Sequence, residues 1–162
     1  MIVGFIGLQR HGKTLSMSLF AEYFHLKYGV PIYSNYTLSE AHSITSVNQL
    51  YNLQNAIICL DEIHQIMDSR DWKNNIDLSY LITQAGKRKL WIFYTTQFID
   101  QVDKRVRENT VFLYHCQKVH EVIFVTKIQN LAMVPLSRFK INDPKIFYPL
   151  FDSFQFLQSL PK

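Results

Sequence analysis

The sequence predicts an α/β fold, a three-layer α-β-α sandwich with a mostly parallel sheet and a C-terminal antiparallel strand or hairpin. Two observations support this class. Strand-sized apolar runs alternate with helical patterns, which is typical of βαβ units. The run at 56–60 is continuously apolar, as expected for a strand covered on both faces. In such a sheet we expect ligands at the carboxyl ends of the strands.

The expected elements follow in order along the chain. Strands are predicted at 2–6, 31–34, 56–60, 90–95 and 111–115, and 119–128 is a hairpin partner. Helices are predicted at 13–28, 47–53, 76–87 and 99–107, with Gly29 ending the first of them. From residue 131 onward four prolines indicate irregular wrapping. We therefore expect one domain over 1–162, with a core at about 1–130 and a wrapping tail at about 131–162.

Composition narrows the class of protein. Hydrophobic residues make up 48% of the 162 residues and charged residues 19%, which indicates a globular chain. No apolar run reaches the roughly 18 residues that a membrane span needs, and no signal peptide is visible. Cys59 and Cys116 lie in apolar runs, so we expect buried thiols. The net charge of +4 favours an acidic partner.

Residues 7–14 match the phosphate-binding loop pattern G-x-x-x-x-G-K-[ST] in full. The pattern alone also occurs in chance glycine-rich turns, but here it follows an apolar strand and opens a helix. Lys13 is expected to contact the β and γ phosphates, and Thr14 to complete a Mg²⁺ shell. The expected nucleotide contacts are Gly7, Leu8, Gln9, Arg10, His11, Gly12, Lys13, Thr14 and Leu15.

Two carboxylates follow the strand at 56–60. Asp61 is expected to hold Mg²⁺, and Glu62 to polarise an attacking water as a general base. Alone, this pair would indicate a solvated acidic turn, and the phosphate loop upstream favours the catalytic interpretation. His64 is expected to be a packed or surface histidine.

Polar and basic residues follow the strand at 90–95. Gln97 is expected to sense the γ-phosphate or the water, with a strand-end cap as the alternative. Arg105 and Arg107 are candidates to act on a neighbouring subunit's site, with Arg70 and Arg88 as competitors. For each arginine a solvated charge or an intrachain ion pair is the alternative.

These motifs resemble the HerA/FtsK-type branch of P-loop ATPases. The chain is most similar to small viral genome-packaging ATPases and to the N-terminal domain of zonular-occludens-toxin-like phage assembly proteins. The matching stretches are 7–14, 32–36, 60–64, 67–70, 86–88, 94–97, 102–109 and 146–153. The resemblance implies a RecA-like core, ATP and Mg²⁺ as cofactors, and a homo-oligomeric ring, expected to be a hexamer, with sites between subunits. It further implies double-stranded DNA as a partner, a possible capsid or membrane-vertex protein, and a location in the virion or host cytoplasm.

The function expected from the resemblance is ATP-driven packaging of a viral genome into a preformed capsid. A zonular-occludens-toxin-type extrusion ATPase is an alternative; the absence of an apolar span ranks it second. Other DNA translocases or helicases and a nucleoside-type kinase are further alternatives. The chain lacks the Asn-Lys-x-Asp motif with which GTPases read the base, which counts against a GTPase. The intact pair of Asp61 and Glu62 disfavours a non-hydrolysing structural subunit. The candidate DNA contacts are Lys73, Lys87, Arg88 and Lys89, and with less support Arg138 and Lys140.

Overall fold

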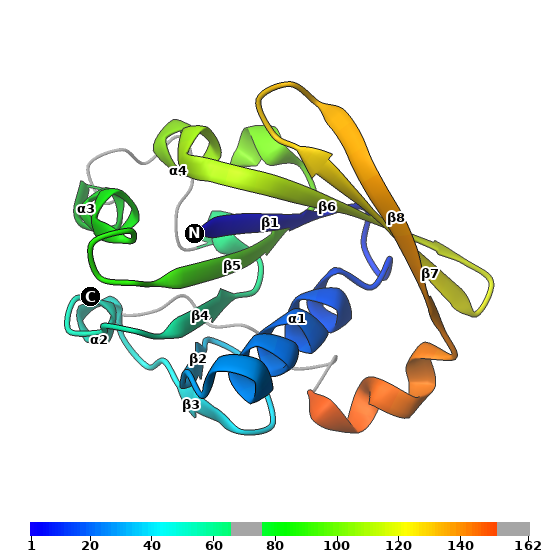
Figure 1. Cartoon of the computed structure of the whole chain (residues 1–162), viewed down its shortest axis with the longest axis horizontal. Helices are drawn as coiled ribbons and strands as arrows, with labels where there is room; N and C mark the ends of the chain where they lie inside the picture. The colour runs from blue at the N-terminus through cyan, green and yellow to red at the C-terminus, as the bar shows by residue number, and fades with distance from the viewer. Residues whose placement is uncertain (66–75, 152–162) are drawn as a thin grey trace.

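The computed structural model describes residues 1–65 and 76–151. Its centre is an eight-stranded sheet with the order β3-β2-β4-β5-β1-β6-β7-β8 (Figure 1). The strands are β1 (Ile2–Ile6), β2 (Ile32–Ser34), β3 (Ala41–Ser43), β4 (Ile57–Leu60), β5 (Trp91–Thr96), β6 (Thr110–Val119), β7 (Val122–Gln129) and β8 (Val134–Asn142). The helices are α1 (Lys13–Tyr28), α2 (Val47–Leu50), α3 (Ile76–Gln84) and α4 (Lys104–Asn109), with 3₁₀ turns η1 (Ile63–Gln65), η2 (Ile99–Gln101) and η3 (Pro144–Leu150).

The strands from β3 to β6 pair in parallel, and β7 and β8 continue the sheet in antiparallel fashion. The strand β5 lies between β4 and β1. The carboxyl ends of β1, β4 and β5 therefore meet at one edge of the sheet. This edge receives the loop at 7–14, the acidic pair and Gln97.

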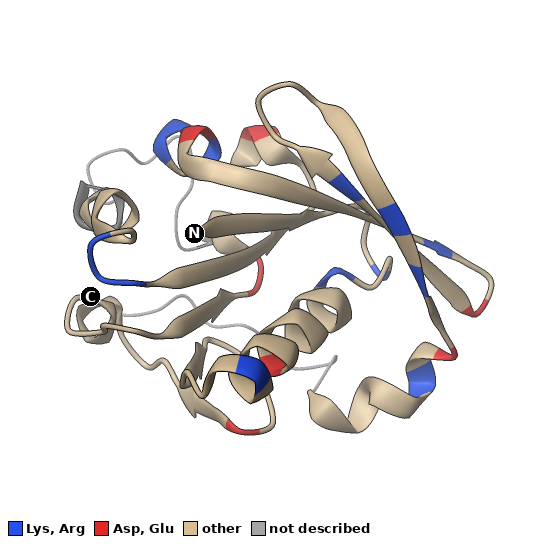
Figure 2. Cartoon of the chain, viewed as in Figure 1, with Lys and Arg blue, Asp and Glu red and all other residues tan. Residues whose placement is uncertain are grey.

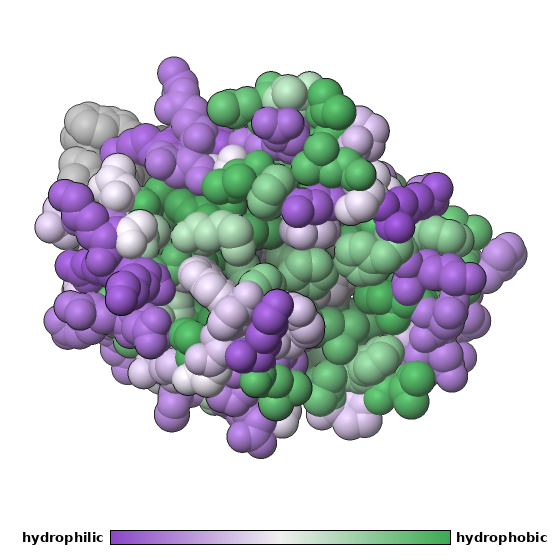
Figure 3. All heavy atoms as spheres, in the orientation of Figure 1, coloured by the Kyte–Doolittle hydropathy of each residue, from purple (hydrophilic) through white to green (hydrophobic). Residues whose placement is uncertain are grey.

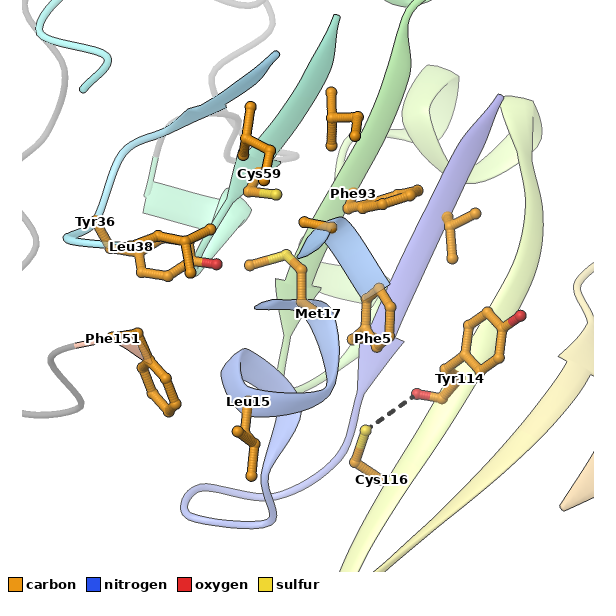
Figure 4. Close-up of a cluster of buried hydrophobic side chains, with 14 of the residues drawn as sticks. Phe5, Leu15, Met17, Tyr36, Leu38, Cys59, Phe93, Tyr114, Cys116 and Phe151 are labelled. Carbon is orange, nitrogen blue, oxygen red and sulfur yellow. Dashed lines mark hydrogen bonds between the residues drawn. The ribbon is translucent and has the colours of Figure 1, made fainter. Parts of the chain in front are cut away.

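Helix α1 covers one face of the sheet. It begins after Gly12 and ends at Gly29, and both glycines have left-handed backbone angles. Its buried side chains include Leu15 and Met17, which lie among Phe5, Phe93 and other apolar residues of the strands (Figure 4). The helix stops at Gly29 because that residue takes a φ of 65° that few other residues adopt, and its N–H closes onto the His25 carbonyl.

The opposite face is covered by α2, α3 and α4, which completes the three predicted layers (Figure 1). Leu50, Leu81 and Val106 bring one apolar side chain from each helix onto the strands. Cys59 and Cys116 are buried free thiols, as expected. Burial raises the pKa of the Cys116 thiol to about 11, so it is protonated and unreactive at neutral pH.

The predicted irregular tail is wrong for residues 134–142, which form the long strand β8. Its Pro135 suggested a break, but β8 is the outermost strand, where a residue without an N–H is tolerated. The chain then wraps back through η3, and Phe151 bridges to Leu38 beside β2. Exposed apolar side chains, including Leu131 and Met133, occupy the turn between β7 and β8, where Figure 3 shows a hydrophobic group of atoms.

Smaller differences concern element boundaries. The strand β3 was not predicted. The predicted helix at 99–107 is divided into η2 and α4, because the Asp103 carboxylate caps α4 by accepting a 2.8 Å hydrogen bond from the Arg105 N–H. The predicted helix at 76–87 ends at Gln84. In the described part of the chain no helix has the length and apolarity that a membrane crossing requires.

Candidate nucleotide-binding site

The loop after β1 requires glycine at two positions. Gly7 has a φ of 145°, and a Cβ there would lie 2.4 Å from the Cys116 carbonyl oxygen of β6. Gly12 has a φ of 84°, and its Cβ would lie 2.4 Å from Cδ1 of Ile123 on β7. The loop is therefore packed against β6 and β7, and side chains at these positions would push its backbone out of place.

The loop opens the amino-terminal end of α1, a helix of 16 residues. No side chain caps this end, so its first N–H groups are available to an anion. The Lys13 side chain is only 6% exposed, and its Nζ donates a 3.1 Å hydrogen bond to the Leu8 carbonyl. Leu8, Gln9 and Arg10 are exposed, and His11 is half-buried. The side chain of Leu15 belongs to the core, so this residue can offer a ligand only its backbone.

The Asp61 carboxylate receives hydrogen bonds from two threonines. Thr14 Oγ1 donates to its Oδ1 at 2.9 Å, and Thr95 Oγ1 donates to the same atom at 2.7 Å. Asn35 fixes the backbone from the other side: its Oδ1 accepts from the Asp61 N–H at 2.8 Å, and its Nδ2 donates to the Asp61 carbonyl at 3.1 Å. A hydroxyl and a carboxylate brought together beside a phosphate loop fit the hard oxygen ligands of Mg²⁺.

Glu62 occupies the space between the loop and η1. Its backbone has a left-handed φ of 50°, and its N–H donates a 2.8 Å hydrogen bond to Thr95 Oγ1. Its Oε1 lies 4.0 Å from Lys13 Nζ, and its Oε2 lies 3.3 Å from His64 Nδ1. Within the described residues neither Oε2 nor His64 Nδ1 makes a hydrogen bond, although both atoms are buried. A carboxylate oxygen with spare acceptor capacity suits a group that takes a proton from water.

Burial determines how both carboxylates titrate. Burial raises the pKa of Asp61, and the hydrogen bonds from Thr95 and Thr14 partly offset this effect. Burial also raises the pKa of Glu62, while the nearby Lys13 ammonium acts in the opposite direction. A raised pKa makes Glu62 a stronger base than a solvated carboxylate.

Gln97 directly follows β5 and so lies at the same sheet edge as the loop and the acidic pair. Its side chain is half-buried and makes no hydrogen bond within the described residues. The alternative cap role belongs instead to Thr96, whose Oγ1 donates to the Phe98 carbonyl at 3.1 Å.

The two candidate arginines of α4 lie away from this edge. Arg105 and Arg107 are in α4, which precedes β6, and the first residue of β6 is level with Ile2 at the start of β1. Arg105 binds Asp103 at 3.1 Å, and Arg107 binds Asp100 at 3.3 Å. These arginines therefore belong to the amino-terminal edge of the sheet, opposite the loop.

The basic cluster 87–89 directly precedes β5 and so also lies at the amino-terminal edge. Arg88 Nη1 donates to the Tyr51 carbonyl, and its guanidinium lies 6.0 Å from the Tyr80 ring centroid. The other two candidates, Arg70 and Lys73, lie outside the described residues.

Sequence reasoning missed three residues of this site. Thr95 and Asn35 both position the acidic pair, and His64 faces the Glu62 carboxylate. Asn35 and Thr95 are polar residues at the carboxyl ends of β2 and β5, and that pattern is visible in the sequence. Their shared target, Asp61, is visible only once β2, β4 and β5 are neighbours.

The site consists of a glycine-bounded loop at the amino terminus of a helix, and Thr14 joins this loop to a buried carboxylate. These features define a P-loop nucleoside triphosphatase. The family model described as Zonular occludens toxin (Zot) matches residues 7–145, and the chain belongs to this family. A search of curated proteins found no match.

Several solved structures share the fold. The N-terminal domain of zonular occludens toxin from Neisseria meningitidis aligns with a TM-score of 0.69 at 17% identity, over 94% of this chain and 98% of that one. The genome packaging NTPase B204 from Sulfolobus turreted icosahedral virus 2, in complex with ATP-gammaS, aligns with a TM-score of 0.61 at 8% identity, over 83% and 95%. The DNA-packaging ATPase B204 from Sulfolobus Turreted Icosahedral Virus aligns with a TM-score of 0.62 at 9% identity, again over 83% and 95%.

Proposed function

We propose that the protein hydrolyses ATP with Mg²⁺ and uses the energy to move DNA during phage or virus assembly. The observation that carries the proposal is the hydrogen bond between Thr14 and Asp61, which joins the phosphate loop to the acidic pair. Glu62 beside this bond supports hydrolysis over binding alone, because a half-buried carboxylate with a free oxygen is suited to accept a proton.

Two DNA-moving functions were expected, and the family match changes their order. The match over residues 7–145 favours the zonular-occludens-toxin-type assembly and extrusion ATPase. Packaging of a genome into a preformed capsid becomes the second candidate, supported by the shared fold of the viral packaging NTPase. Double-stranded DNA, a capsid or membrane-vertex partner, and a location in the virion or host cytoplasm belong to that packaging candidate.

The residues divide the work of the reaction. The N–H groups of the loop and Lys13 Nζ would hold the phosphates, and Thr14 and Asp61 would hold Mg²⁺. When bound, Mg²⁺ supplies positive charge that offsets the charge of the phosphate oxygens. Glu62 would orient the attacking water and accept its proton, with Lys13 and His64 on either side of the carboxylate. Gln97 is proposed to sense the γ-phosphate from the same edge.

We further propose that the active unit is a ring, expected to be a hexamer, in which an arginine completes the site of the next subunit. Arg105 and Arg107 lie at the edge opposite their own loop, which suits a residue that serves a neighbour. The Arg107–Asp100 pair costs little to break, because Asp100 is 89% exposed and such surface pairs contribute about 0–1 kcal/mol. Arg105 is held more firmly, because its partner Asp103 is only 7% exposed. Arg88 suits this role less well, since it is held by Tyr51 and Tyr80.

The deciding experiment is the Glu62→Gln variant. We expect ATP-analogue affinity close to that of the wild type and turnover lower by about 10²–10⁴-fold, because the amide cannot accept a proton. Glu108→Gln is the matched control, since Glu108 is exposed on α4 and pairs only with Lys104 among the described residues. Wild-type turnover in Glu62→Gln would remove the proposed base.

Subunit mixing tests the shared site. Arg105→Ala or Arg107→Ala subunits are combined with Glu62→Gln subunits, and the ATPase rate is compared with that of each variant alone. Partial recovery is expected if an arginine acts on its neighbour, because some interfaces then unite an intact base with an intact arginine. No recovery for either arginine would count against the ring arrangement.

A further inference from the structure

The strands β6, β7 and β8 form an antiparallel extension whose two faces differ. Phe139 on β8 lies on the α1 side, with its ring 5.9 Å from that of Phe20 and 6.4 Å from that of Tyr114. Neighbouring residues of a strand point to opposite faces. Arg138 and Lys140 therefore point away from α1, and both are exposed.

Strand register places two rows of side chains on this outer face. His115 is level with Thr126, and Thr126 is level with Arg138. In the next row Gln117 is level with Phe124, and Phe124 with Lys140. We call these residues the cross-strand platform, which consists of His115, Gln117, Phe124, Thr126, Arg138 and Lys140. Arg138 lies 4.6 Å from the centroid of the Phe124 ring, which holds its guanidinium against the sheet.

The platform carries cations without matching acids. The segment 110–142 contains one acidic residue, Glu121, and four cations. Arg138 and Lys140 lie on the platform, whereas Lys118 and Lys127 lie on the α1 face, level with Ile123 and Tyr114. Glu121 lies at the β6–β7 turn and pairs with Lys145 at 3.4 Å. Figure 2 shows basic segments on β6, β7 and β8, and acidic ones only at that turn and just after β8. Among residues 1–65 and 76–151, no carboxylate pairs with Arg138 or Lys140.

We propose that the cross-strand platform binds the phosphate backbone of DNA without reading the bases. The inference rests on the proposed function and names the surface through which this domain grips its substrate. Arg138 and Lys140 are about 6.7 Å apart along one strand, so both can contact one backbone at once. The hydroxyl of Thr126 and the amide of Gln117 add hydrogen-bond donors that phosphate oxygens accept.

Two of the other basic residues, Arg88 and Arg105, are less suited to this task. Arg88 is engaged by Tyr51 and Tyr80, and Arg105 is bound to Asp103 in both a charged pair and a helix cap. A backbone-binding surface instead needs cations that are not already held by a carboxylate or a carbonyl oxygen, because phosphate contacts replace solvent and counterions.

Two of the strands that carry the platform, β6 and β7, also pack against the phosphate loop of the nucleotide site. Cys116, whose carbonyl packs on Gly7, lies between two platform residues, His115 and Gln117. Ile123, whose side chain packs on Gly12, directly precedes Phe124. DNA on the outer face therefore lies on the same strand segments that support the phosphate loop from within. DNA binding at the platform is accordingly expected to change the rate of ATP turnover.

The test is DNA binding by the Arg138→Gln/Lys140→Gln double variant, measured by fluorescence anisotropy with labelled single-stranded and duplex oligonucleotides. A non-hydrolysable ATP analogue is present, so the readout does not depend on hydrolysis. Lys87→Gln/Lys89→Gln is the matched control, because it removes two exposed cations from the competing cluster. Thermal melting establishes that both variants are folded.

We expect the platform variant to bind the preferred oligonucleotide at least tenfold more weakly than the wild type. The slope of the logarithm of its binding constant against the logarithm of salt concentration should become shallower by about 1.4–1.8, because each lost phosphate contact accounts for about 0.7–0.9. The control should keep its affinity and its slope. The basal ATPase rate should be unchanged in the platform variant, while any stimulation by DNA is lost.

Three results would overturn the platform. The first is that the wild-type protein binds neither oligonucleotide. The second is that the platform variant keeps the wild-type DNA affinity and salt slope. The third is that only the Lys87/Lys89 control loses DNA affinity. Vesicles of neutral lipid mixed with anionic phosphatidylglycerol form a further arm. If the platform variant loses vesicle binding and keeps DNA binding, the surface belongs to a membrane. Failure of the ATPase proposal would be seen separately, as absent turnover in a protein that still binds DNA through Arg138 and Lys140.

Discussion

Replacement of Asp61 by asparagine should stabilise the protein without nucleotide and abolish its stabilisation by Mg²⁺-ATP. The carboxylate is buried, and burial raises its pKa. The unfolded chain therefore loses this proton at lower pH than the folded protein does. As the pH rises through the unfolded and then the folded pKa, stability falls, and the full penalty is present above the folded pKa. An amide avoids this penalty.

The size of the effect follows from the contacts of Asp61. An asparagine Oδ1 can still accept the hydrogen bonds from Thr14 and Thr95, so these are retained. Lys13 keeps Glu62 as a counter-charge at 4.0 Å. We therefore expect a net gain of about 1 kcal/mol in the free energy of unfolding at pH 8, because an amide loses less hydration on burial than a carboxylate does. For a chain of this length, about 1 kcal/mol corresponds to a rise of about 2–4 °C in Tm.

The assay is thermal melting at several pH values, with and without Mg²⁺-ATP. At a ligand concentration 100 times Kd, the wild type should gain about 2.7 kcal/mol, and Asp61→Asn should gain little. Without nucleotide, the difference in Tm between the variant and the wild type should vanish below about pH 4. At that pH the Asp61 side chain is neutral, as the asparagine of the variant is at every pH. A lower Tm for the variant at pH 8, or an equal gain from Mg²⁺-ATP in both proteins, would refute the reasoning.

Two further predictions concern the loop and the acidic pair. Gly7→Ala should destabilise the fold more than Gly12→Ala, by about 2 kcal/mol or more against about 1–2 kcal/mol, because its Cβ meets a backbone carbonyl of β6 and not the movable end of a side chain. Denaturant unfolding measures both, and Ile123→Ala should partly rescue only Gly12→Ala; equal effects would contradict this account. Thr95→Val should weaken Mg²⁺-dependent nucleotide binding and slow turnover, because it removes the hydroxyl that binds both Asp61 and the Glu62 N–H. Titration calorimetry with and without Mg²⁺ checks this, and unchanged binding and turnover would assign Thr95 no role in the site.

Much of the site follows from local sequence because the phosphate loop is local. Gly7, Gly12, Lys13 and Thr14 lie on one turn between a strand and a helix, so their spacing alone predicts how they are arranged. The acidic pair is local in the same way, as two carboxylates at the end of an apolar run. The place of β5 between β4 and β1 brings Gln97 to the edge of the sheet that carries the loop.

Other features depend on contacts between distant segments. The role of Asn35 rests on β2 and β4 being neighbours, since it binds Asp61 across 26 positions of the sequence. The strand β8 was missed because Pro135 indicates a break in any local pattern, and only its place at the sheet edge makes the proline acceptable.

The sequence by itself determined the α/β class, the phosphate loop and the acidic pair, because each depends on residues that are close along the chain. The tertiary structure alone decided which groups surround Asp61 and Glu62, and that Arg105 and Arg107 lie at the far edge from their own loop. It also decided that β6 and β7 support the loop on one face while the other face of the β6–β8 extension carries the cations Arg138 and Lys140. These are matters of strand order and register, which arise from long-range pairing and burial and leave no pattern in a short stretch of residues.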